Sequence, residues 1–293
     1  MTGSRGKKTA GWDVARLAKS EKVFWTELWE APCVDALYER GADLVRFGPV
    51  RAACLTSERA APELNFVLGG GEAGAVRHGH LADAVAWLES RCMRWDHTDG
   101  ELEGRGVEYR VPVVPGLPES GAAERWLREV GHTWAKGTPK LARDSSPLRC
   151  EPAAGIEVLA WEWDEGFGEP LAEGLGLPWA GELFFLSLLD SEGWRCYGAV
   201  LGDEPLAYVA MRVHAGVASI ALASRPCSGR DGEGQLAVLE RCVADAAAEG
   251  CDAIAVVDAG AEPPTVDRRS LLRAGFEPAF RTHTWHSPVR VAA

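Results

Sequence analysis

A glycine-bearing loop in the second half of the chain is the segment best suited to do chemistry. It spans Cys227–Gly234, follows the strand-like segment Val217–Ser224 and precedes a helical pattern of apolar residues. The first backbone N–H groups of a helix have no partner within the helix, and together with the helix dipole they attract anions. Glycines let a backbone approach a phosphate with no Cβ in the way. The loop therefore predicts a site for a pyrophosphate.

The elements that must position this loop lie on either side of it. Two more strand-like segments precede it, separated by turn residues. A helix, a continuous apolar strand, a short helix that ends at Gly275 and a last strand from Phe276 follow it. The preceding strands are Trp194–Leu201 and Leu206–Val213, the helix carries Leu236, Leu239, Val243 and Ala247 at helical spacing, the next strand is Ala253–Val257 and the short helix is Arg268–Ala274.

The first half of the chain contains a fainter copy of this order. A strand, a glycine loop, a helix, a strand broken by Pro112 and a short helix that ends at Gly131 follow one another. They are assigned to Leu64–Leu68, to Gly69–Gly74, to a helix with Leu81, Val85, Leu88 and Cys92 on one face, to Val107–Val114 and to Ala122–Val130. The two terminating glycines are 144 positions apart (275 − 131 = 144). We infer an internal duplication.

Length and composition agree with two domains. The chain has 293 residues, of which 46% are hydrophobic, and a single core rarely grows so large. The polar, proline-bearing stretch Ala142–Pro152 predicts the junction. We expect a disordered tail at 1–12, a degenerate domain at 13–145 and a second domain at 146–293 that carries the loop.

Three motifs resemble the GNAT superfamily of acyl-CoA N-acyltransferases. Gly229-Arg-Asp-Gly232-Glu-Gly234 resembles the pyrophosphate loop of that superfamily, usually Q/R-x-x-G-x-G/A. Leu271-Leu-Arg-Ala-Gly275-Phe276 resembles its short helix ending in Gly-Phe, and the turn Gly202-Asp-Glu-Pro205 resembles a hairpin common there. The whole chain looks like the tandem form, in which two such folds are fused and the first is degenerate.

This resemblance implies both a fold and a co-substrate. The fold is α/β of the α+β type, with two GNAT-like mixed sheets flanked by helices and arranged as a tandem repeat. The co-substrate is acetyl-CoA or another acyl-CoA, bound by the second half. The residues that would bind it are Leu222, Ala223, Ser224, Gly229, Arg230, Asp231, Gly232, Glu233, Gly234 and Gln235.

The sequence departs from the superfamily pattern in two ways. Gly229 stands where Gln or Arg is usual, and Asp231 and Glu233 place negative charge in a loop meant to hold phosphate. Many members use as general acid a Tyr that lies five residues before the Phe of Gly-Phe, and here that position is Leu271. The remaining candidates for a proton donor near the motif are Ser270, His283 and His286.

A general base and an acceptor cleft have weaker signals. Trp161 and Trp163 alternate with acids, so strand geometry would place both indoles on one face. They either pack in the core or, together with Trp179, line a cleft for the acceptor. In the second case Glu162 or Glu182 would serve as the base toward an ammonium group.

Other signals favour structural roles. Gly69–Gly74 matches G-x-G-x-x-G, but the helical pattern starts only near Gly79, so we do not infer dinucleotide binding. His78 and His80 have no third partner at metal-ligand spacing. The eight cysteines form no C-x-x-C pair, which indicates reduced, buried thiols in a cytoplasmic protein.

The charge balance and the apolar runs narrow the range of partners. The formal net charge of −12 argues against a nucleic-acid partner and fits a cationic or amine substrate. No apolar run approaches the roughly 20 residues of a membrane helix, and the basic N-terminal residues lead into no apolar stretch, so we expect no signal peptide. We expect a monomer or a weak homodimer that transfers an acyl group from CoA to a small amine. The alternative is a non-catalytic CoA-binding or regulatory module that retains the fold.

Overall fold

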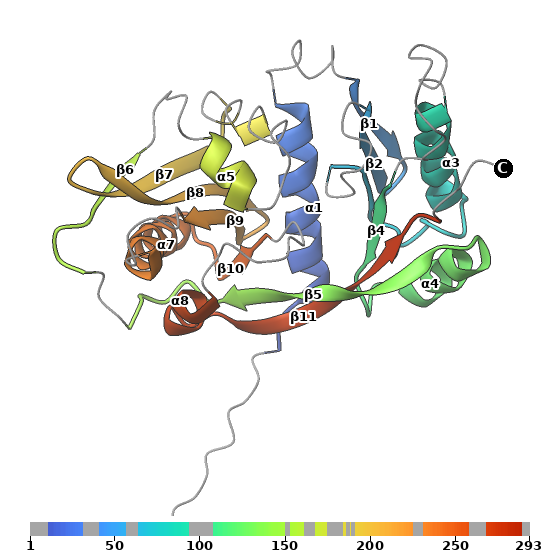
Figure 1. Cartoon of the computed structure of the whole chain (residues 1–293). Coiled ribbons are helices and arrows are strands. Elements are labelled where there is room, and N and C mark those ends of the chain that lie inside the picture. The colour runs from blue at the N-terminus through green and yellow to red at the C-terminus, as the bar shows by residue number, and fades with distance from the viewer. Residues whose placement is uncertain are drawn as a thin grey trace, which may run out of the picture.

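A computed structural model describes residues 11–31, 41–56, 64–93, 108–149, 153–160, 168–174, 184–185, 188, 191–224, 231–257 and 268–288. The described strands form a single mixed sheet of 11 strands in the order β1-β2-β3-β4-β11-β5-β10-β9-β8-β7-β6 (Figure 1). The mixed sheet and its flanking helices confirm the predicted fold class. The two sheets expected from the sequence are, however, joined into one.

Each half of the chain contributes a block of consecutive strands to this sheet. The first block comprises β1 (Ala42–Phe47), β2 (Val50–Leu55), β3 (Phe66–Leu68) and β4 (Arg110–Val113), with helices α3 (His80–Met93) and α4 (Ser120–Glu129). The second block comprises β6 (Glu157–Ala160), β7 (Trp194–Leu201), β8 (Glu204–His214), β9 (Val217–Ser224) and β10 (Ala253–Val256), with helices α5 (Gly168–Gly174), α7 (Asp231–Ala248) and α8 (Arg268–Arg273).

The inferred duplication is visible in the hydrogen bonds that end the two short helices. After α4, His132 N–H donates to the Leu127 carbonyl (2.9 Å), and after α8 Phe276 N–H donates to the Leu271 carbonyl (2.9 Å). Gly131 and Gly275 take φ angles of +91° and +87°, the left-handed conformation in which a glycine ends a helix. The order strand, loop, helix, strand, helix, strand therefore recurs from β3 and again from β9.

The last strand of each half crosses into the other block. These strands are β5 (Thr133–Arg143) and β11 (Glu277–His286). β11 pairs with β4 of the first block, with Trp285 opposite Val111, whereas β5 pairs with β10 of the second block, with Ala255 opposite Ala142. The two crossing strands also pair with each other in antiparallel register, and Figure 1 shows them running side by side beneath both blocks. The sequence alone gave no hint of this exchange.

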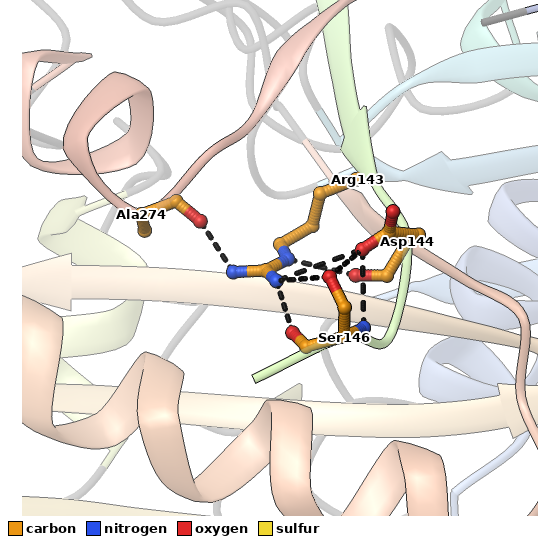
Figure 2. Close-up of polar contacts among 4 residues, drawn as sticks. All are labelled: Arg143, Asp144, Ser146 and Ala274. Carbon is orange, nitrogen blue, oxygen red and sulfur yellow. Dashed lines mark hydrogen bonds and ion pairs between the residues drawn. The ribbon is translucent and has the colours of Figure 1, made fainter. Parts of the chain in front are cut away.

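Arg143, at the end of β5, joins this crossing strand to the second block by hydrogen bonds. Its guanidinium donates to the carbonyl of Ala274 just after α8, and also to the carbonyls of Asp144 (2.7 Å) and Ser146 (Figure 2). The side chain is buried, and three carbonyl acceptors compensate the desolvation of its charge. The start of the predicted second domain, near 146, is thus bound to the last strand of the first. The division at 145/146 remains a proposal.

Helix α1 (Val14–Glu30) lies between the blocks and contacts both. Asp13 caps its first turn, and its Phe24, Trp25, Leu28 and Trp29 lie in a core shared with residues of β2, β3, β8 and β9. Toward the second block, the Ser20 hydroxyl bonds that of Ser219 (2.8 Å). Toward the first block, Lys22 pairs with Glu72. Residues 1–10 of the tail expected at 1–12 lie outside the described residues. Trp12 packs on a core cluster that includes Leu17 of α1 and Ala142 of β5.

Gly137 permits the close approach of the two crossing strands. A Cβ at this position would overlap the carbonyl oxygen of Thr282 in β11, which is backbone and cannot move aside. We predict that Gly137→Ala lowers the free energy of unfolding by about 1–3 kcal/mol, the usual cost of overpacking. Urea denaturation measures this change.

The matched control is Gly121→Ala, because Gly121 lies in α4 with only the end of Arg125 near its Cβ position. That variant should be neutral or slightly stabilising, since alanine favours a helix. Equal midpoints for Gly137→Ala and the parent protein would contradict the close approach.

Candidate functional site

The predicted CoA site lies along β9, past the last pair that this strand forms with β10 among the described residues, and we call that side of β9 the opening. These strands are parallel, and their pairing runs from Val217 opposite Ala253 to Ile220 opposite Val256. Val257 N–H then donates to the Ile220 carbonyl (2.7 Å). Backbone groups alternate along a strand, so those of Leu222 and Ser224 point to the same side of β9 as those of Ile220, where no described strand pairs with them. Ala223 faces β8, where it pairs with Tyr208. Two of the three predicted strand residues thus present backbone N–H groups to the opening.

The first five residues of α7, a helix that packs on β9, are five of the predicted cofactor residues, Asp231, Gly232, Glu233, Gly234 and Gln235. Gly229 and Arg230 lie outside the described residues. A Cβ on Gly234 would lie 2.5 Å from the Cβ of Leu206 in β8. This glycine therefore permits close packing of helix on sheet, and Gly234→Trp would disrupt the core in addition to blocking a phosphate.

Gln235 is the described residue of this turn that most requires a partner. The residue is fully buried, and neither its amide nitrogen nor its amide oxygen has a hydrogen-bond partner among the described residues. A buried amide without partners is costly, so a group beyond those described must satisfy it. An amide-bearing pantetheine arm is one group with suitable donors and acceptors, which is how these residues fit an acyl-CoA.

The candidate proton donors do not converge on this opening. Ser270 is fully buried, and its hydroxyl donates to the Gly232 carbonyl (3.3 Å), which ties α8 to the first turn of α7. Leu271, at the position of the expected tyrosine, is buried in the core beneath α7. His283 lies in the first block, opposite Val113 of β4, with its Nδ1 2.6 Å from Glu124 of α4. Glu162 and Glu182, with Trp161, Trp163 and Trp179, lie outside the described residues.

The first block has a comparable opening between β3 and β4, and a proline explains where it begins. Arg110 N–H donates to the Asn65 carbonyl (3.0 Å), and the two strands pair at Phe66 opposite Arg110. The ladder would next bring the N–H of residue 112 to the Val67 carbonyl, but Pro112 has no N–H. A cavity of ≈ 140 Å³ lies at this point.

A carboxylate of the chain itself occupies the anion-binding part of the first glycine loop. Glu119, the residue before α4, accepts hydrogen bonds from the backbone N–H groups of Gly74 (2.9 Å), Val76 (2.7 Å) and Arg77 (3.2 Å). Successive N–H donors of this kind form a nest for an anion. The bonds from Gly74 and Val76 hold the pKa of Glu119 below its ordinary value. Sequence reasoning missed Glu119, although an acid just before a predicted helix is a cue for such a contact.

The pKa of Glu119 gives a prediction with a definite sign. A carboxyl with a lowered folded-state pKa stabilises the fold above its unfolded pKa, and this contribution is lost as the pH falls through the folded value. Glu119→Gln should therefore melt below the parent protein at pH 7, and the two melting curves should converge as the pH falls below about 4. Thermal melts from pH 3 to 7 measure the difference. A difference that does not change with pH would contradict the ionic role.

No family model matches the sequence, and no curated protein matches it either. Solved structures match it throughout. A GCN5-related N-acetyltransferase from Kribbella flavida is 13% identical, covers 96% of this chain and 98% of its own, and superposes with a TM-score of 0.57. One from Sphaerobacter thermophilus is 19% identical over 85% of this chain and 84% of its own, with a TM-score of 0.55.

A third structure decides the arrangement. A tandem GNAT protein from the clavulanic acid biosynthesis pathway is 18% identical over 83% of this chain and 79% of its own, with a TM-score of 0.52. The chain has the tandem GNAT fold. At these identities the likeness concerns the fold alone.

The histidines and cysteines considered in the sequence analysis, where they are described, pack against other parts of this GNAT fold. The rings of His78 and His80 stack with centroids 5.9 Å apart, and no cluster of three metal-binding side chains occurs in the described part of the chain. Cys54, Cys196, Cys242 and Cys251 are buried and form no disulfide, as expected for these four cysteines. Burial raises the pKa of the Cys196 thiol to about 12, so it is not a nucleophile near neutral pH. None of the described helices is both long and apolar enough to cross a bilayer.

Proposed function

We propose that the second block binds an acyl-CoA, most simply acetyl-CoA, and that the protein transfers the acyl group to a small amine. The observation that carries this proposal is the open edge of β9 beside the first turn of α7. Backbone N–H groups at Leu222 and Ser224 face the opening, and the helix start supplies further unpaired N–H groups for phosphate. The buried amide of Gln235, near the start of α7, adds an unsatisfied donor and an unsatisfied acceptor. The N-acetyltransferases with this fold agree with the proposal.

Acyl transfer forms a C–N bond and breaks the C–S bond of the thioester, which supplies the activated acyl group. The amine nitrogen gives its proton to a base, and the departing sulfur takes up a proton. Backbone N–H groups on the open edge of β9 would polarise the thioester carbonyl. They are held rigidly by the ladder between β9 and β8, so little reorganisation is needed during the reaction.

A second candidate function is CoA binding without turnover. It is favoured by Leu271, whose side chain lies in the core and cannot donate a proton to the sulfur. The hydroxyl of Ser270, close to the same turn, is already bonded to Gly232. Release of free thiol from acetyl-CoA in the presence of a panel of small amines separates the two functions. Mass spectrometry of the natively purified protein for bound CoA tests the site that both share.

Replacement of a single backbone donor tests the open edge of β9. Ser224→Pro removes the N–H that faces the opening, while the pairing with β8 uses the opposite edge. Pro112 of β4 shows that the sheet accepts proline at such a position. We predict that Ser224→Pro weakens acetyl-CoA binding at least about tenfold, in line with the loss of one well-aligned hydrogen bond.

Ser224→Ala is the matched control, because it removes the side chain and keeps the N–H. It should bind acetyl-CoA like the parent protein in calorimetry, and thermal melts should show both variants folded. Equal affinities for Ser224→Pro and Ser224→Ala would show that acyl-CoA does not use this edge.

Neutralising the two acids at the start of α7 should change acetyl-CoA affinity and thermal stability in opposite directions. Asp231 and Glu233 repel phosphate, but acids in the first turn of a helix also stabilise it by about 0.3–1 kcal/mol each. Asp231→Asn with Glu233→Gln should therefore tighten acetyl-CoA binding while lowering the melting temperature. The gain in affinity should shrink as salt is added.

The matched control for this double variant is Asp203→Asn with Glu240→Gln. Both residues are exposed, and the change in net charge is the same. Asp203 lies in the turn between β7 and β8, and Glu240 lies mid-way along α7. An equal gain in affinity from the control would mean that net charge, rather than the loop, governs binding.

A further inference from the structure

The cavity in the first block is a second candidate site, separate from the opening between β9 and β10. Its volume is ≈ 140 Å³, and its lining contains none of the predicted CoA-binding residues. Its walls come from α1, from the loop after β3, from β4, from β5 and from β11. Thr282, Thr284 and His286 of the exchanged strand β11 contribute one wall, so the cavity exists only because the two halves have exchanged strands.

The charge of the cavity contrasts with that of the chain. Lys22, Arg110, Lys136 and Lys140 line it, against Glu21 and Glu72. Lys22 pairs with Glu72, and Lys140 pairs with Glu21 (2.5 Å). With these two pairs formed, Lys136, which has no ion-pair partner among the described residues, leaves an excess of positive charge in the lining, whereas the whole chain carries −12. Such a local excess favours a negatively charged ligand.

Lys22 is a largely buried cation at the wall of the cavity. Its side chain is 13% exposed, and its ammonium also donates to the Pro49 carbonyl (3.0 Å). Desolvation by burial lowers the pKa of Lys22 below its ordinary value. An anion beside this ammonium would be screened by little water, which strengthens the attraction.

The rest of the lining and the volume indicate an organic ligand of small size. Trp25, Leu68, Val114, Leu117 and Ala135 provide an apolar surface beside the cations. A cavity of about 150 Å³ accommodates benzene, so the space suits a body of roughly six non-hydrogen atoms. The backbone N–H groups of Gly70 and Gly71 also border the space, and within the described part of the chain no acceptor is bonded to them.

The neighbouring loop argues against a CoA in this cavity. The nest formed by Gly74, Val76 and Arg77 already holds the carboxylate of Glu119. A pyrophosphate would have to displace that carboxylate or lie beside it, and like charges in contact repel. The loop thus leaves room for a small anion in the cavity but not for a diphosphate next to it.

We propose that the cavity binds a small organic anion, with an anionic head group beside Lys22 and Lys136 and a short apolar body against Trp25 and Leu68. This site is independent of the acyl-CoA site proposed above. A ligand here contacts α1 and both crossing strands, so its binding also stabilises the connection between the two blocks.

Isothermal titration calorimetry of the full chain at low salt tests the site with three probes: butyrate, n-butylamine and inorganic phosphate. We expect saturable binding of butyrate, no binding of n-butylamine and weaker binding of phosphate, which lacks the apolar body. Lys136→Gln should weaken butyrate binding at least about fivefold, because Lys136 lines the cavity and is exposed enough to be replaced without unfolding. Lys19→Gln is the matched control, since Lys19 is exposed on α1 and lies outside the lining.

Three results would overturn the proposal: no butyrate binding, equal binding of butyrate and n-butylamine, or equal effects of Lys136→Gln and Lys19→Gln. Competition with acetyl-CoA separates this proposal from the acyl-CoA site. If acetyl-CoA displaces butyrate and still binds the Ser224→Pro variant, CoA occupies the cavity and the small-anion site is wrong. If butyrate binds as expected while acetyl-CoA binds nowhere, the cavity assignment holds and the acyl-CoA proposal fails.

Discussion

The antiparallel pairing of β5 with β11 makes one sheet out of two repeats. Thr133 lies opposite His286 at one end of this pairing and Ala142 lies opposite Glu277 at the other. Each strand extends past its own block and adds to the ladder of the other. Edge strands expose unpaired N–H and C=O groups, and the exchange removes two such edges from the middle of the molecule. Arg143 fixes one end of the exchange, and Ser287 fixes the other by bonding the backbone of Tyr109 in both directions.

The same scaffold has been adapted differently in its two copies. In the first block, Pro112 opens the ladder between β3 and β4, and Glu119 fills the nest of N–H groups in the glycine loop. In the second block, the hydroxyl of Ser270 ties α8 to the first turn of α7, and no described strand pairs with β9 past Ile220 on the side of β10. A few side chains therefore distinguish the two copies at the equivalent glycine loop and strand edge. The exchanged strand and α1 then enclose a separate cationic space in the first block.

Local patterns predicted much of this fold. The apolar runs and turn residues of the second half gave β7, β8, β9, α7 and β10 nearly as they are, because each depends on neighbouring residues. The glycines at 131 and 275 identified the repeat, since both need a positive φ to end a helix. The strand exchange could not be predicted in this way, because nothing local in β11 tells whether it pairs with β4 or with β10.

The candidate sites show the same division between local and long-range information. Gly232 and Gly234 marked the helix start correctly, but the packing of Gly234 on Leu206 depends on β8, which lies far back in the sequence. His283 looked close to the Gly-Phe motif along the chain, yet β11 carries it into the first block. Helix α1, which lines the cavity and joins the blocks, was not predicted, although Asp13 and the apolar positions after it are recognisable signals for a helix.

The central claim is that the exchanged strands make the two blocks one cooperative unit. Hydrogen exchange of the full chain across a series of urea concentrations tests it most directly, with protection read at Val111 and Val113 in β4 and at Ile254 and Ala255 in β10. Since β4 depends on β11 and β10 depends on β5, the account predicts that both strands lose protection at the same urea midpoint. Loss of protection in β4 at a urea concentration where β10 stays protected would show that the blocks unfold separately and would contradict the claim.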